Sequence, residues 1–551
     1  MRRNAEAPDR VIGSLVNAFT QFTFDEFHIF ESPQIVAVTN ILLLIRELAG
    51  ARCPRFLFLS ATPNEAMLQF LNRAGVPFQE IKGQYAHGTS PNIHDWRLIL
   101  RETQLTLRAM TITEWVDAHL DDTLLRFFHE QGKHAKGAII VNSVATAQGL
   151  YRRLKSSCDR YGIRLALNTG FDSKKARQQS YDADLLIGTS TIDVGVDFKI
   201  NFLLFESRDA GTFLQRLGRL GRHGEFERNG ENLEFHKFEA HALVPEWVHT
   251  ALFEGRDGQP RMLAADESVD REMFANFIKT AFPTANPFVN YGRHWGGLQS
   301  AHICMFLANP LIRDAYTETR KRLIGQYERV LDIHINSECR RLTELRKEQP
   351  PLVDEALSFR GSSLFECGVI DMRLPEGEIR AKRYNLLWLL SNTHIELIDK
   401  DAFEKIARLE GWVDTTLKRF NPVAYCKCLS LRDEHLNIEF LVGHDLQAYE
   451  ADWFHTAQVL DQIEITTKDV PSVNTINRIL MQLELPVLLS TFSPHELRRR
   501  MRLPSLFQLY AMRGRGDTVK GTIAFGRQAL MLDSLLRGRR DLLPPQTAII
   551  S

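Results

Sequence analysis

The sequence predicts an α/β protein with a parallel sheet that is covered by helices. Five short apolar runs each end in polar residues, namely QFTF before Asp25 and Glu26, FLFL before Ser60, AIIV before Asn142 and Ser143, LLI before Gly188 and Thr189, and FLLF before Glu206. Near-continuous apolar runs of this length are typical of strands that are buried on both faces. Helix-like stretches, such as 113–131 and 145–156, lie between several of the runs, and this alternation indicates a parallel sheet.

The composition is that of an ordinary globular protein, with 551 residues of which 44% are hydrophobic and 25% charged. This length favours about three or four domains. Lys+Arg and Asp+Glu both number 68, so the net charge gives no evidence for a nucleic-acid partner, and any basic surface must be local. The seven cysteines are scattered, and Cys426 and Cys428 have no second pair at zinc-binding spacing, which indicates reduced thiols.

We expect a cytoplasmic protein with no membrane partner. The longest apolar run, near 35–45, is interrupted by Thr39 and Asn40 and is far shorter than the ~20 residues that a membrane span needs. The first ten residues, MRRNAEAPDR, lack the apolar segment of a secretory signal.

Three successive regions are expected. Residues 1–82 would form a first, incomplete α/β domain, and residues 83–250 a second one. After about residue 250 the pattern changes, and 251–551 is expected to be an accessory region that is mixed but mainly helical.

The C-terminal tail is locally basic, because residues 498–540 hold ten Arg and one Lys against two Asp. It could contact phosphates, with Phe507 and Tyr510 available to stack on bases. The alternative is a solvated or protein-contacting face.

Asp25 and Glu26 follow a predicted buried strand. In a nucleotide hydrolase the first carboxylate would hold Mg²⁺, usually through water, and the second would orient or deprotonate the attacking water. Ser60 and Thr62 close the next strand and could hydrogen-bond this pair, which would couple hydrolysis to movement between domains. The alternative is an acidic pair that ends a strand at a helix cap. His28, grouped here with the coupling residues, would by itself be an ordinary surface histidine.

The stretch from Gly188 to Asp197 predicts a second set of contacts. Gly188 lets the backbone pass close to a ligand. Thr189 could donate to a phosphate of a nucleic-acid strand, and Asp193 and Asp197 could orient arginines or meet the ribose and the attacking water. The alternative is a tight strand-to-helix turn capped by Thr189 and Ser190.

The sharpest pattern is Q-x-x-G-R-x-G-R, formed by Gln215, Gly218, Arg219, Gly221 and Arg222. The two arginines are three residues apart, so on a helix both would project from one face. A guanidinium stabilises the charge on a transferring γ-phosphoryl group, and such arginines can contribute ~10³ to 10⁵ in rate. The alternative is a basic helix face.

Together FDEFH, LSATP, IIVNSVATA, LIGTSTIDVGVDF and QRLGRLGR resemble a superfamily 2 helicase over residues 1 to about 250. The DEFH variant and the segment FRGSSLFECGVID resemble the standalone CRISPR-associated helicase of type I-D systems. A further match near the C-terminus is LPSLFQLY with GTIAFGRQALMLDSLL.

The resemblance implies two RecA-like domains, the first incomplete, that close on ATP and Mg²⁺ and step 3′ to 5′ along single-stranded DNA. It also implies a prokaryotic partner, a CRISPR surveillance complex whose nuclease belongs to a separate large subunit. The implied catalytic residues are Asp25, which also binds the metal, Glu26, Gln215, Arg219 and Arg222. The implied coupling residues are His28, Ser60 and Thr62. The implied nucleic-acid contacts are Ser143, Gly188 and Thr189, and the implied nucleotide contacts are Asp193, Gly195, Asp197 and Gly218.

No G-x-x-x-x-G-K-[ST] phosphate loop occurs in the 551 residues, and only 24 residues precede Asp25. We therefore expect an N-terminally truncated chain that does not hydrolyse ATP by itself. Two alternatives stay open: an ATPase-dead adaptor that binds nucleic acid or the surveillance complex, and an RNA helicase of the same superfamily.

Overall fold

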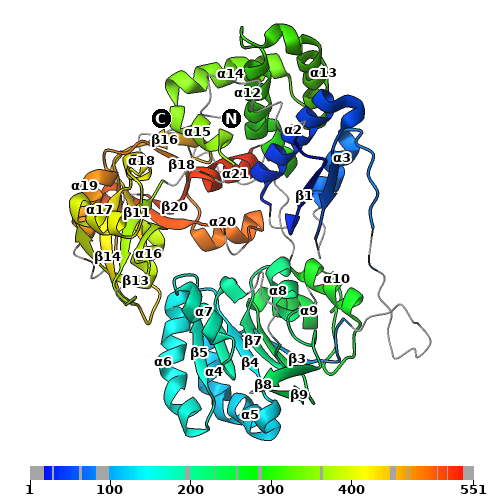
Figure 1. The fold of residues 1–551 in the computed structure, drawn as a ribbon, viewed down its shortest axis with the longest axis vertical. Helices are drawn as coiled ribbons and strands as arrows, with labels where there is room; N and C mark the ends of the chain where they lie inside the picture. Colours follow the sequence, from blue (N-terminus) through cyan, green and yellow to red (C-terminus); the bar gives the residue numbers. More distant parts are fainter. Residues whose placement is uncertain are drawn as a thin grey trace, which may run out of the picture. The chain divides into compact units, whose positions relative to one another are not determined.

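The computed structural model describes residues 18–27, 30–60, 65–81, 83, 99–192, 199–228, 230–255, 258–282, 288–359, 361, 364–375, 377–446, 454–467, 470, 472–504, 507–517 and 519–537. The chain forms two compact units (Figure 1). Unit 1 comprises Met1–Lys82, Ala285–Leu364 and Glu439–Ser551, and unit 2 comprises Gly83–Thr284 and Phe365–Ile438. Each unit therefore joins segments that are far apart in the sequence.

This division differs from the three successive regions expected from the sequence. The first segment of unit 1 ends at Lys82, where a boundary was expected. Position 250 lies inside helix α9, Glu246–Phe253, and residues 251–551 are shared between both units.

The centre of unit 2 is a six-stranded sheet in the order β3-β10-β7-β4-β6-β5, and every neighbouring pair is parallel. Its strands are β3 Gln104–Arg108, β4 Gly137–Ile140, β5 Leu165–Asn168, β6 Leu185–Gly188, β7 Phe202–Glu206 and β10 Glu239–Leu243. The predicted α/β class with a parallel sheet is confirmed, and three of the predicted apolar runs correspond to β4, β6 and β7.

Helices cover both faces of this sheet because successive strand residues point to opposite sides. One face of β4 packs through Ile139 and Val141 against α4, α5 and α6, while the other packs through Ala138 and Ile140 into the core beneath α8, α9 and α10. The helices of unit 2 in this region are α4 Ile112–His119, the π-helix Leu120–Leu125, α5 Arg126–Gln131, α6 Val144–Arg160, α7 Lys174–Ser180, α8 Ala210–Leu217, α9 Glu246–Phe253 and α10 Arg271–Ala281. A hairpin of β8 Glu225–Arg228 and β9 Glu231–Glu234 completes it.

Residues 365–438 add a second, four-stranded sheet to unit 2, which we call the appended sheet domain. Its strand order is β12-β11-β14-β13. Its elements are β11 Glu366–Asp371, β12 Ala381–Asn385, α16 Leu386–Asn392, β13 Thr393–Ile398, α17 Lys400–Leu409, α18 Asp414–Arg419 and β14 Ala424–Leu431.

The N-terminal part of unit 1 contains two parallel strands, β1 Gln21–Phe24 and β2 Arg55–Phe58. Aligned rings hold them together, since Phe22 stacks on Phe56 at 5.6 Å and Phe24 on Phe58 at 4.8 Å between centroids. Helix α2, Ser32–Ala49, follows β1, and helix α3, Glu65–Arg73, follows β2.

Helix α2 is long and apolar enough to cross a membrane by length and composition alone, but 61% of its apolar window is buried. Its Asn40 side chain accepts a hydrogen bond from Ser300 at 3.0 Å, and the Asn40 carbonyl accepts one from the Tyr327 hydroxyl at 3.1 Å. These are the contacts of a helix packed inside unit 1.

The rest of unit 1 combines a helical layer with a six-stranded sheet in the order β16-β18-β20-β19-β15-β17. The helical layer comprises α11 Phe288–Tyr291, the π-helix η6 Gly292–Gly296, α12 Gly297–Leu307, α13 Arg313–Leu331, α14 Ile335–Glu348 and α15 Pro350–Leu357. The sheet and its helices comprise β15 Glu439–Val442, β16 Ala457–Leu460, β17 Ile463–Thr466, α19 Val473–Leu480, β18 Leu485–Ser490, α20 Pro494–Met501, β19 Tyr510–Gly514, β20 Lys520–Phe525 and α21 Gly526–Leu536. The C-terminal region is mixed, as expected.

The buried carboxylate of Asp533 on α21 joins three elements of unit 1. It accepts hydrogen bonds from Trp295 Nε1 at 2.8 Å, from Arg537 Nε at 3.1 Å and from the backbone N–H of Ala457 at 3.4 Å. Burial opposes its ionisation, but His294 and Arg537 together hold the pKa of Asp533 below its ordinary value.

We predict that Asp533→Ala destabilises unit 1 by about 3–5 kcal/mol, because the change leaves several buried donors without an acceptor. Arg537→Ala should cost about 1 kcal/mol or less, since its side chain is half exposed. Urea unfolding monitored by amide exchange of α21 measures both values. Equal losses in the two variants would contradict the central role of Asp533.

Stability should also fall on mild acidification because of His294. Burial, together with repulsion from Arg341 and Arg537, lowers the pKa of His294 to about 4 even though the nearby Asp533 raises it. An unfolded histidine titrates near 6.5, so between pH 6.5 and 4 the unfolded chain binds a proton that the folded chain does not. This group should therefore contribute about 2 kcal/mol less stability at pH 5 than at pH 7.5.

The measurement is amide exchange of η6 and α21 at the two pH values in the wild type and in His294→Gln. The glutamine variant should lose part of the pH dependence. The same pH dependence in both proteins would rule out His294 as its source.

Candidate functional site

The polar motifs of unit 2 lie at the carboxyl ends of its central strands. Ile140 of β4 pairs with Gly188 of β6 and with Phe205 of β7, so these three strands end at the same edge. Ligands of parallel sheets bind at this edge. Asn142, Thr189 and the residues that follow β7 therefore lie at one edge of the sheet.

Arg216 organises this edge, although the motif analysis did not single it out. Its side chain is 2% exposed, and its guanidinium donates to Asn142 Oδ1 at 3.0 Å and to the carbonyl oxygen of Glu206. The N–H of Asn142 in turn donates to Glu206 Oε2 at 3.0 Å. The signal in the sequence is position: Arg216 follows the buried Phe213 by three residues, so it faces the core and needs acceptors there.

The prediction that Arg219 and Arg222 project from one face of a helix is wrong. Helix α8 ends at Leu217, with Gly218 as its C-cap, and Gly221 has a φ of +76°. The helix therefore ends before both arginines, and Gly221 turns the chain between them. Arg219 is buried at 8% exposure, whereas Arg222 is exposed and its Nε donates to the carbonyl oxygen of Gly218. Gln215, on the last turn of α8, is half-buried.

Gly221 is also tightly packed, because a Cβ there would lie 3.1 Å from the backbone nitrogen of Arg101. The Arg101 N–H donates to the Gly221 carbonyl at 3.1 Å. The segment that leads into β3 thus holds the turn that carries Arg222.

Gly188 is required for close packing rather than for an unusual backbone angle. A Cβ at this position would lie 2.7 Å from the carbonyl oxygen of Asn168 and 2.9 Å from Ile192 Cδ1. Thr189 is 7% exposed, whereas the neighbouring Ser190 is exposed. The hydroxyl most accessible to a ligand in this turn is therefore that of Ser190.

Ser143 begins helix α6 and is bound by the appended sheet domain. Its hydroxyl accepts from the Thr146 N–H at 3.4 Å and donates to Asn392 Oδ1 at 3.2 Å. The same Asn392 oxygen accepts from the Ala145 N–H at 3.2 Å. Asn392 thus caps the N-terminus of α6, a contact that could not be predicted from local patterns because it joins residues about 250 positions apart.

A second contact attaches the appended sheet domain to the loop after β5. The Phe171 ring, almost fully buried, lies 4.5 Å from the Arg373 guanidinium and 5.0 Å from Lys382 Nζ. Both cations pair with the buried carboxylate of Asp371, at 2.9 and 3.0 Å. Burial opposes ionisation of Asp371, but these two partners hold its pKa below the ordinary value. Tyr384 packs against the other side of the ring at 4.9 Å.

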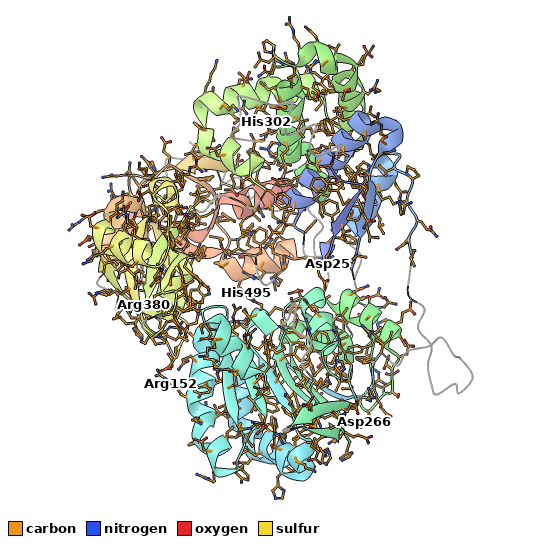
Figure 2. All side chains as sticks on the ribbon, viewed as in Figure 1. Asp25, Arg152, Asp266, His302, Arg380 and His495 are labelled. Atoms are coloured by element: carbon orange, nitrogen blue, oxygen red, sulfur yellow. The ribbon has the colours of Figure 1, made fainter. Side chains whose placement is uncertain are left out.

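In unit 1, the acidic pair and Ser60 lie at the ends of the two adjacent parallel strands. Phe24 pairs with Phe58, the N–H of Leu59 donates to the Phe24 carbonyl at 2.9 Å, and Asp25 comes directly after β1 (Figure 2). Glu26 has a φ of +50°, unusual for a residue other than glycine, and its N–H donates to Asp25 Oδ1 at 3.0 Å.

An exposed carboxylate beside a second acid and a hydroxyl is a donor set that suits Mg²⁺, which takes one or two carboxylates with water and phosphate oxygens. Within the described ranges, no group of three or more His, Cys, Asp or Glu side chains is arranged to hold a metal ion. Asp25, the exposed carboxylate of the pair, could supply only part of such a ligand set. The predicted site residues that lie outside the described residues are His28, Thr62, Asp193, Gly195 and Asp197.

Residues 133–225 match the family model described as "CRISPR-associated nuclease/helicase Cas3, C-terminal". This segment contains β4, β6, β7 and the arginine motif, so the edge described above lies within a Cas3-like C-terminal helicase segment. No curated protein matches the chain.

Among solved structures, T. fusca Cas3 matches at 15% identity with a TM-score of 0.37, over 66% of this chain and 43% of that chain. A chain of a CRISPR RNA-guided surveillance complex in a pre-nicking state matches at 18% identity and a TM-score of 0.30, over 41% and 31%. S. cerevisiae Dbp5 bound to RNA and ADP BeF3 matches at 17% identity and a TM-score of 0.27, over 49% and 67%. The chain thus spans less than half the length of the Cas3 chain that it matches.

Arg216 and Arg222 should respond differently to substitution. Arg216→Ala removes a buried guanidinium and leaves the Asn142 side chain and the Glu206 carbonyl without their donor, so we expect a loss of about 2–4 kcal/mol in stability. Arg222→Ala, at an exposed position, should change stability by about 0.5 kcal/mol or less. Thermal unfolding of both variants is the measurement, and a harmless Arg216→Ala would show that the network does not hold the edge.

Proposed function

We propose that this protein is an ATP-dependent single-stranded DNA translocase or helicase of CRISPR antiviral defence. The observation that carries the proposal is the match of residues 133–225 to the Cas3 C-terminal model, with the matched motifs gathered at one edge of a parallel sheet. That edge is where such sheets bind ligands. A shared edge for Gly188, Thr189 and the arginine motif suits a site for a nucleotide and a nucleic-acid strand.

Within this proposal, the arginine motif meets the transferring phosphate. Arg222 is exposed, whereas Arg219 is 8% exposed, so we assign Arg222 to the γ-phosphate and Arg219 to the shape of the turn beneath it. Asp25 would hold Mg²⁺ and Glu26 would act on the attacking water. Gln215, Gly218 and the residues around Gly188 complete the proposed contacts.

The proposed partners are single-stranded DNA and a CRISPR surveillance complex of the type I-D class, whose nuclease belongs to another subunit. The sequence resemblance in FDEFH and FRGSSLFECGVID supports this class. The second segment leads into β11, the strand of the appended sheet domain that carries Asp371. An RNA substrate is the alternative, and competition between DNA and RNA oligonucleotides of the same length distinguishes them.

An ATPase-dead adaptor is the second candidate function. It is favoured by one observation, that the 551 residues contain no G-x-x-x-x-G-K-[ST] segment, whose backbone and lysine would hold the β- and γ-phosphates. An adaptor would bind single-stranded DNA with strong salt dependence and would be indifferent to ATP.

We expect the isolated 551-residue chain to bind single-stranded DNA but to show no measurable ATP hydrolysis, because its carboxylates and arginines lack a phosphate-holding loop. The measurement is phosphate release with and without oligo(dT), alongside fluorescence anisotropy of labelled oligo(dT). ATP turnover that Arg222→Ala abolishes would overturn the inactive-chain expectation. Absence of DNA binding at low salt would overturn the proposed function in both of its forms.

A further inference from the structure

We propose that helix α20 and the adjoining β19–β20 hairpin of unit 1 form a second, sequence-independent contact for the phosphate backbone of single-stranded DNA. This inference rests on the proposed function, and it adds a contact that lies outside the helicase motifs. We call it the α20 basic surface, made of His495, Arg499, Arg500, Arg502, Arg513 and Lys520.

One face of α20 is exposed and basic. His495 and Arg499 are four residues apart and share one side of the helix, and Arg502 is the left-handed C-cap that directly follows Met501, the last residue of α20. All three are exposed. The opposite side packs into unit 1 through Leu497 and Met501, which are buried. Figure 2 shows His495 on this helix.

The remaining arginines of α20 have structural partners. Arg498 donates to the carbonyl oxygens of Pro504 at 3.2 Å and Phe507 at 2.9 Å. Arg500 pairs with Glu496 at 2.7 Å and lies over the Phe492 ring at 4.6 Å. Arg499 and Arg502 are the residues that the fold leaves directed at solvent.

The hairpin extends the positive charge beyond the helix. Ser490 of β18 pairs with Thr522 of β20, so the chain that enters α20 runs beside the start of β20, at Lys520. Lys520 is exposed and is the cross-strand partner of Arg513. Lys520 therefore places a further exposed cation beside the segment that leads into α20.

The helix dipole explains only part of this arrangement. Cations in the last turn of a helix are stabilised by its negative end, which accounts for Arg498 to Arg500. It does not account for the cations of the hairpin. Since Lys+Arg and Asp+Glu are equal over the whole chain, positive charge gathered at one place fits a polyanionic partner.

Phe507 and Tyr510, expected to be available for stacking on bases, are not. Phe507 is 4% exposed, and Tyr510 is half-buried, with its ring packed 5.3 Å from that of Phe440. Burial raises the pKa of Tyr510 to about 12. The residues of the α20 basic surface therefore offer charge without an exposed Phe, Tyr or Trp ring, which suits phosphates rather than base readout.

The test is the double charge reversal Arg499→Glu/Arg502→Glu in the full chain, with anisotropy of labelled oligo(dT) measured across a salt series. We expect about tenfold or more weaker binding and a log–log salt slope that is about 1.4 smaller in magnitude, the value for two lost phosphate contacts on a single strand. The loss should be the same for mixed-sequence oligonucleotides, because no base contact is involved.

The matched control is Arg340→Glu/Lys347→Glu on α14, which makes the same charge change at two exposed positions of the same unit. It should leave affinity and salt slope near those of the wild type. Equal losses in both variants, or no loss in the α20 variant, would overturn the α20 contact while leaving the proposed function intact. If the wild type itself did not bind DNA, the proposed function would fail, and this inference with it. Thermal unfolding of both variants, together with the neutral pair Arg499→Gln/Arg502→Gln, separates misfolding from lost contact.

Discussion

The geometry of the helicase-like edge depends on one buried cation, Arg216. A guanidinium that is 2% exposed is tolerable only if its N–H groups find acceptors, and here these are the Asn142 side chain and the Glu206 carbonyl. Both acceptors sit at strand ends, so the bonds tie α8 to β4 and β7 together. The turn that contains Gly218 and Gly221 follows α8 directly. By fixing α8, Arg216 therefore sets the position of Arg222 without having to contact a ligand itself.

The appended sheet domain contacts two segments that follow strands of the same parallel sheet. Asn392 binds Ser143 at the start of α6, and the cluster of Asp371, Arg373 and Lys382 holds Phe171 in the loop after β5. Ion pairs this buried are costly to form and strongly favour a single geometry once formed. A movement of the appended sheet domain would therefore change the positions of Ser143 and of the loop after β5.

The strands of unit 2 could be predicted because AIIV, LLI and FLLF are apolar throughout, a pattern typical of doubly covered strands. The same expectation is wrong for QFTF and FLFL, because alternate residues of β1 and β2 are exposed. The polar residues that follow the strands of unit 2 indicated the edge formed by their carboxyl ends. The sequence spacing predicted that the helix continues to Arg222, and this was wrong. Gly218 caps α8 and Gly221 turns the chain, so the helix ends in the middle of the motif. Spacing alone shows which residues would share a helix face and does not show where the helix stops.

The C-terminal region was beyond prediction for a different reason. Its segments pack with partners far away in sequence, as when Asp533 on α21 receives a hydrogen bond from Trp295 and α2 packs against α13. Local patterns do not show such pairings, so Phe507 and Tyr510 were expected to be available at the surface of a basic tail, although Phe507 is buried and Tyr510 packs against Phe440. With these two rings packed inside unit 1, the exposed groups of this region are mainly cations. Cations bind a phosphate backbone without reading its bases.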